Sequence, residues 1–74
     1  MKVVLDRKEF NHWLKFFGYN QQQMVEMLNY QYDLDLKYKS YNKMINGHNL
    51  WTLETALGTA QIFDIPFEQL FIFK

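Results

Sequence analysis

The sequence has no cysteine, which excludes disulfides, thiolate metal sites and cysteine nucleophiles. Its two histidines, His12 and His48, are far apart along the chain and cannot form a zinc site alone. With three glycines, one proline and no tract rich in Ser and Gly, no linker divides the chain. Neither sign of charge dominates: eight Lys and Arg balance eight Asp and Glu, which rules out a uniformly basic nucleic-acid coat.

Long hydrophobic runs are missing as well. The longest purely apolar run covers residues 70–73, whereas a transmembrane helix needs about 20 residues. Charged residues at positions 6–9 interrupt any signal-peptide core near the start of the chain. We therefore expect a cytoplasmic protein with no membrane partner, and the lack of cysteine agrees with that compartment.

The chain does contain ample material for a hydrophobic core. Of its 74 residues, 49% are hydrophobic and 19% are aromatic, too many for an intrinsically disordered chain. This length suits a single domain, residues 1–74. Start and stop signals predict short helices joined by brief connections, so the expected fold class is all-α, a compact bundle of about five helices.

The first predicted helix covers residues 6–17. Asp6 can cap it, and Glu9 lies three residues later, as in a capping box. One apolar stripe follows at helical spacing, formed by Phe10, Trp13, Leu14 and Phe17. Gly18 then ends the helix, because glycine readily takes the left-handed conformation found there.

The second predicted helix begins at Asn20, with Gln23 in the capping-box position. Its inner face is expected to carry Met24, Val25 and Leu28. Residues 29–36 then alternate between apolar and polar types, a period typical of a strand. Since a lone strand has no partner here, this stretch is either an ordered loop or an extension of the helix.

Three further helices are expected after that stretch. The third covers residues 37–46, has Tyr41, Met44 and Ile45 inside, and ends at Gly47. The fourth begins at Thr52, and Gly58 within it indicates close helix packing. Its expected buried side chains are Leu53, Ala56, Leu57, Ala60 and Phe63. The fifth begins near Pro66 and turns Phe67, Leu70 and Phe71 inward.

This ordered series resembles the Cro/CI-type helix-turn-helix family, also called XRE or lambda-repressor-like. The residues that carry the resemblance are Asn20, Gln21, Met24, Val25 and Leu28, then residues 41–47 and 53–57, then Ala60, Ile65 and residues 68–71. The chain resembles small phage-type members in which the connection between the second and third helices is extended.

The resemblance implies that the second and third helices bind double-stranded DNA. Gln21 would contact a phosphate, and free N–H groups and the helix dipole favour an anion there independently. The third helix would enter the major groove, with His48 and Asn49 near phosphates after it. Its outward residues would be Tyr38, Lys39, Asn42 and Lys43, where Lys suits guanine and Asn suits adenine.

The distribution of charge supports this placement. Residues 36–53 contain Lys37, Lys39 and Lys43 and no Asp or Glu, whereas acidic residues outnumber basic ones on either side. The segment of the proposed recognition helix is therefore the only positively biased stretch of the chain. A local phosphate footprint requires such a bias.

The apolar ends of the chain admit two interpretations. They either fold back onto the core or fray, or they form a dimer interface that includes paired terminal strands. The interface residues would be Val3, Val4, Leu5, Phe71, Ile72 and Phe73. A homodimer suits DNA binding, because two-fold proteins read two half-sites about one DNA turn apart.

The leading hypothesis is a Cro-like repressor that occupies an operator as a homodimer. The alternative is a protein-interaction module on the same fold, an antirepressor or antitoxin that pairs with a repressor or toxin; neutral net charge and high aromatic content favour it. We expect no enzyme, no cofactor and no metal. Ser40 is the only serine, neither histidine has a carboxylate partner in a motif, and no glycine-rich phosphate loop exists.

Overall fold

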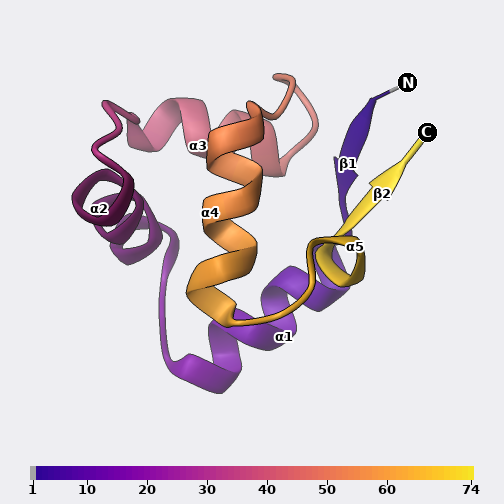
Figure 1. Cartoon of the computed structure of the whole chain (residues 1–74), viewed down its shortest axis with the longest axis horizontal. Coiled ribbons are helices and arrows are strands. Elements are labelled where there is room, and N and C mark those ends of the chain that lie inside the picture. The colour runs from indigo at the N-terminus through magenta and orange to yellow at the C-terminus, as the bar shows by residue number, and fades with distance from the viewer. Residues whose placement is uncertain (1) are drawn as a thin grey trace.

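The computed structural model describes residues 2–74 as a mostly helical chain whose two ends pair with each other. The elements are β1 (Val3–Leu5), α1 (Arg7–Phe17), α2 (Gln21–Tyr32), α3 (Tyr38–Ile45), α4 (Leu53–Phe63), α5 (Phe67–Leu70) and β2 (Phe71–Phe73). Figure 1 shows α4 in the centre, with α2 on one side of it and the small sheet on the other. The five predicted helices are therefore present, and a short sheet is added to the all-α expectation.

Local capping signals explain where the helices begin. The Asn20 side chain accepts a hydrogen bond from the backbone N–H of Gln23, and the Gln23 side chain accepts one from the backbone N–H of Asn20, which confirms the predicted capping box. At α1, Asp6 caps the helix as predicted, but the rest of the predicted capping box is wrong. The backbone N–H of Asp6 donates to the Leu70 carbonyl and not to the Glu9 side chain. The Glu9 carboxylate instead accepts a hydrogen bond from the Trp13 indole at 3.1 Å.

The stretch at residues 29–36 combines both structures that the sequence left open. The helix continues to Tyr32 and ends at Asp33, which has a left-handed φ of 54°. An ordered connection to α3 follows. The Asn29 side chain holds it, since its amide donates to the Leu36 carbonyl at 3.0 Å and its oxygen accepts from the Leu36 N–H at 2.8 Å.

The core lies where α4 meets the other helices. Its largest fully buried side chains include Tyr41, Phe10, Phe63 and Phe71. The close helix packing predicted at Gly58 is present: a Cβ added there would lie 2.7 Å from the Leu28 Cδ2 atom of α2.

The predicted inner face of α4 is partly wrong. Leu53 is 69% exposed and Leu57 is 40% exposed, while Thr55 and Thr59 are buried instead. The Thr59 hydroxyl donates to the Thr55 carbonyl at 2.8 Å and so meets its polar requirement inside the helix. Because α2 passes so close, small side chains fill the inner face and the two leucines turn outward.

Candidate nucleic-acid interface

Three buried side chains attach α3 to the rest of the domain and leave one face outward. Tyr41, Met44 and Ile45 are buried, as predicted. On the opposite side, Lys39, Lys43 and Asn46 are exposed at a spacing of four and three residues, which places them along one line of the helix. We call these three residues the α3 ridge.

The anchor of α3 is the Tyr41 side chain. Its hydroxyl lies 3.0 Å from the Thr59 hydroxyl oxygen of α4. Because Thr59 donates its one proton to the Thr55 carbonyl, Tyr41 is the donor in this pair. Burial raises the pKa of the Tyr41 phenol well above its ordinary value. The anchor is therefore neutral at physiological pH, and it fixes the ridge relative to α4.

A hydrogen bond joins the ridge side of α3 to the start of α2. The Asn42 amide donates to the Gln21 Oε1 atom at 2.9 Å, and the Asn46 amide donates to the Asn42 Oδ1 atom at 3.0 Å. Two residues that the sequence assigned to different DNA contacts are thereby brought together. Asn42 is only partly exposed, and both its amide nitrogen and its oxygen are hydrogen-bonded within the protein, the first of them to Gln21.

The lysines of the ridge have no acidic partner. Within residues 2–74, the one ion pair joins Lys37 to Asp35 at 3.4 Å, and both of these side chains are exposed. Such an exposed pair contributes little to stability. Lys39 and Lys43 consequently keep their full charge available to a ligand, whereas Lys37 is partly compensated by its neighbour.

The remaining predicted contacts surround this ridge. Tyr38 is the first residue of α3 and is 44% exposed. His48 and Asn49 follow α3 and are exposed, but their backbone N–H groups donate to the Lys43 carbonyl at 2.8 and 3.3 Å. Their backbone N–H groups are therefore not free to bind a phosphate, so their side chains would have to make the predicted contacts. Asn46 was not among the predicted contact residues, although its position seven residues after Lys39 was a signal for the ridge.

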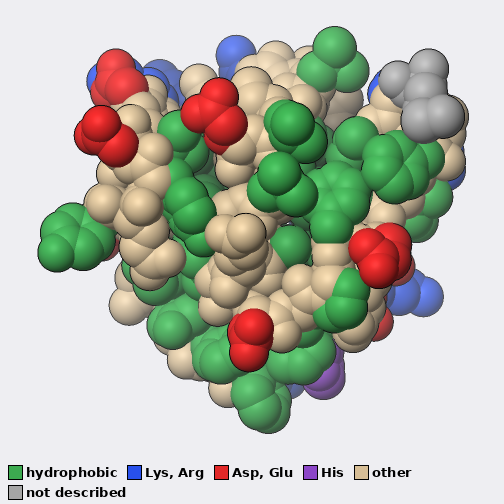
Figure 2. All heavy atoms as spheres, viewed as in Figure 1, with side chains coloured by type: hydrophobic (Ala, Val, Ile, Leu, Met, Phe, Trp, Pro, Cys, Tyr) green, Lys and Arg blue, Asp and Glu red, His purple; other side chains and the backbone are tan. Residues whose placement is uncertain are grey.

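The terminal segments fold back onto the core and pair as an antiparallel sheet within one chain. Leu5 and Phe71 are buried, so of the six residues considered for a dimer interface these two already belong to the core. Ile72 and Phe73 are about half exposed, at 44% and 52%. Figure 2, viewed from the same side as Figure 1, shows hydrophobic side chains gathered between the upper end of α4 and the sheet, with Lys and Arg only at the rim.

Three further observations concern the surroundings of this interface. No group of three or more His, Asp or Glu residues within residues 2–74 is placed to hold a metal ion. In the same described part of the chain, every helix is too short or too polar to cross a membrane. Comparison with protein-family models, with curated proteins and with solved structures finds no match for this chain.

Proposed function

We propose that this chain is a sequence-specific DNA-binding transcriptional regulator with a lambda-repressor-like helix-turn-helix, in which α3 enters the major groove. The observation that carries the proposal is the hydrogen bond from Asn42 to Gln21. It joins the N-terminus of α2 to a ridge with two unpaired lysines. One surface thus combines a site suited to a phosphate with side chains suited to base edges.

The phosphate site would lie at the start of α2. The Gln21 amide nitrogen keeps its donors, because only its oxygen is used in the bond with Asn42. The first turn of α2 contains no acidic residue, so nothing there opposes an anion. The helix dipole and the free N–H groups of this turn add attraction for a phosphate.

Base reading would fall to the α3 ridge. Lys39 and Lys43 can donate to guanine O6 or N7, and Asn46 can pair with adenine. Tyr38, His48 and Asn49 would contact sugars and phosphates at the two ends of the helix. Asn42 would position Gln21 and would not itself contact a base, although asparagine is a residue type that suits adenine.

A homodimer is part of this proposal. Two copies related by a two-fold axis would present two α3 helices to half-sites about 34 Å apart. The half-exposed side chains of Ile72 and Phe73 are the terminal residues best placed to meet a second copy. Sedimentation at micromolar concentration tests this point, and a monomer under those conditions would remove the dimer while leaving the DNA-binding proposal intact.

The decisive experiment measures DNA binding against salt. Binding to duplexes from the DNA that flanks the protein's own gene is followed by gel shift at low and physiological ionic strength. We expect the double variant Lys39→Ala and Lys43→Ala to weaken binding and to flatten the slope of log K against log salt by about one to two units.

The matched control is the double variant Lys8→Ala and Lys15→Ala, which removes the same charge from exposed positions of α1. It should keep nearly all of the salt slope. If the two double variants lose affinity equally, or if the wild-type protein shows no salt-dependent binding, the proposed interface is wrong.

The second candidate is a protein-interaction module, an antirepressor or antitoxin. The observation that favours it is the apolar outer surface beside the start of α4, where Leu50 is 73% exposed and Leu53 is 69% exposed. Under this function Leu53→Asp would abolish binding to a purified repressor while the two lysine substitutions would leave it unchanged. Under the leading function the lysine substitutions alone would matter.

A further inference from the structure

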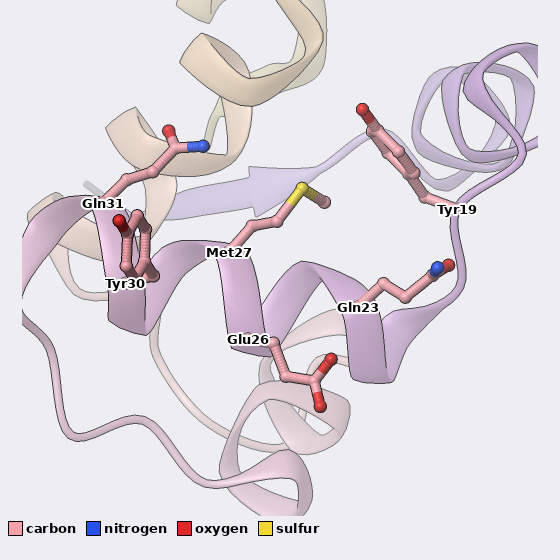
Figure 3. A pocket seen from close by; sticks show the side chains of 6 residues that line it. All are labelled: Tyr19, Gln23, Glu26, Met27, Tyr30 and Gln31. Carbon is pink, nitrogen blue, oxygen red and sulfur yellow. The ribbon is translucent and has the colours of Figure 1, made fainter.

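The outward face of α2 contains a shallow pocket that the proposed DNA interface does not use. Its volume is about 310 Å³, and it is lined by Tyr19, Gln23, Glu26, Met27, Tyr30 and Gln31. In Figure 3 the Tyr19 ring and the Met27 and Gln31 side chains rise on the same side of α2. This volume is at the low end of ligand pockets, which fits one side chain better than a whole metabolite.

An exposed aromatic ring stands beside this pocket. Tyr30 is 90% exposed, the most exposed of the large hydrophobic side chains in the described chain. It lies four residues after Glu26, so the ring and the carboxylate are neighbours on the helix surface. Nothing in the fold requires a tyrosine at so exposed a position, whereas a binding surface often uses one.

The pocket has one charged residue in its lining, the acidic Glu26. Glu26 takes part in no ion pair within residues 2–74. The unpaired Glu26 carboxylate therefore favours a cation in this pocket, in contrast to the lysines of the α3 ridge.

Arginine is the side chain whose chemistry matches these groups. Its guanidinium can stack on a tyrosine ring, its planar donors fit a carboxylate, and its aliphatic stem packs on apolar surface such as Met27. Lysine offers only a compact, strongly hydrated charge. A neutral side chain would leave the Glu26 charge uncompensated.

We propose that the pocket between Tyr19, Met27 and Tyr30, with Glu26 at its rim, is a docking site for an arginine side chain of a basic segment in a partner protein. The site is separate from the α3 ridge and does not depend on the DNA-binding proposal. None of the residues that line the pocket belongs to the α3 ridge, so the two surfaces share no side chain.

The test is an NMR titration of the ¹⁵N-labelled full chain with the blocked tripeptide Gly-Arg-Gly. The neutral isostere Gly-citrulline-Gly and the peptide Gly-Lys-Gly serve as matched ligands. We expect saturable shifts in the backbone amides of residues 26–31, with affinity for the arginine peptide about five- to tenfold above that for the citrulline peptide. Equal affinity for citrulline or for lysine would overturn the assignment to arginine.

Variants separate this site from general charge attraction. Glu26→Gln and Tyr30→Ala change exposed side chains, so both variants should fold, and each should weaken the arginine peptide severalfold. Glu68→Gln on α5 removes the same charge from another exposed position and should leave the affinity unchanged. If Glu26→Gln and Glu68→Gln behave alike, the proposal is wrong. Replacing Lys39 and Lys43 by alanine should weaken DNA binding and leave peptide binding unchanged. The arginine site and the DNA interface can therefore be refuted independently of each other.

Discussion

Replacing Gly58 by alanine sets two effects of known size against each other. In an unpacked helix, alanine is more favourable than glycine by about 1 kcal/mol. Here the new methyl group would lie 2.7 Å from the Leu28 Cδ2 atom and 3.1 and 3.2 Å from two carbons of the Tyr32 ring. Overpacking of this kind costs about 1–3 kcal/mol.

The neighbours decide which effect is larger. Leu28 is fully buried, and the Tyr32 hydroxyl donates a 2.6 Å hydrogen bond to Gln61 on α4, so neither side chain can move away freely. We expect Gly58→Ala to lower the free energy of unfolding by about 1 kcal/mol net. In a domain of this size that corresponds to a loss of about 4–8 °C in Tm.

The assay is urea unfolding followed by circular dichroism, in a cycle with Leu28→Ala. That substitution alone should cost about 2–5 kcal/mol, and the space it opens should accept the new methyl group at position 58. The double variant should therefore lose about 1 kcal/mol less than the sum of the two single losses. A Gly58→Ala protein more stable than wild type, or strict additivity with Leu28→Ala, would show that α2 and α4 are not in tight contact at this point.

Three other predictions concern polar groups. Tyr41→Phe should cost about 1 kcal/mol at neutral pH. Burial raises the Tyr41 pKa above its ordinary 10.0, so above pH 10 the unfolded chain loses the phenol proton more readily than the folded one. The contribution of neutral Tyr41 to the free energy of unfolding is therefore complete below pH 10 and falls above it, by up to about 1.4 kcal/mol per pH unit. Urea midpoints at alkaline pH should fall less steeply for Tyr41→Phe than for wild type, and equal slopes would contradict this. Asn29→Ala should cost about 1–2 kcal/mol and speed amide exchange at Leu36, whereas unchanged exchange there would mean that Asn29 does not hold the connection. Asn20→Ala should cost about 1 kcal/mol, judged against Gln22→Ala as the surface control, and equal losses in the two variants would argue against the cap.

Helix boundaries could be read from the sequence because their signals are local. Asp6, Asn20 and Thr52 each bond a backbone N–H two or three residues away, and Gly18 ends α1 with a left-handed φ. Such contacts form whatever the rest of the chain does. The inner face of α3 was equally readable, since its apolar residues recur at helical spacing.

The inner face of α4 was not readable in the same way. Both leucines and threonines recur there at helical spacing, and hydrophobicity alone favours the leucines. The choice depends on the distance between α2 and α4 and on Thr59, which meets Tyr41 from another helix. No local pattern contains that distance.

The candidate interface likewise has features that follow from local sequence and features that follow from tertiary packing. Composition and spacing determined its basic stretch, its outward lysines and the cap that opens α2, because each depends on residues within one or two helical turns. The contact between Gln21 and Asn42 joins residues 21 positions apart, and the sheet joins the two ends of the chain. These arrangements follow from how the helices pack around α4, since packing brings together groups whose separation along the chain carries no information about their separation in space.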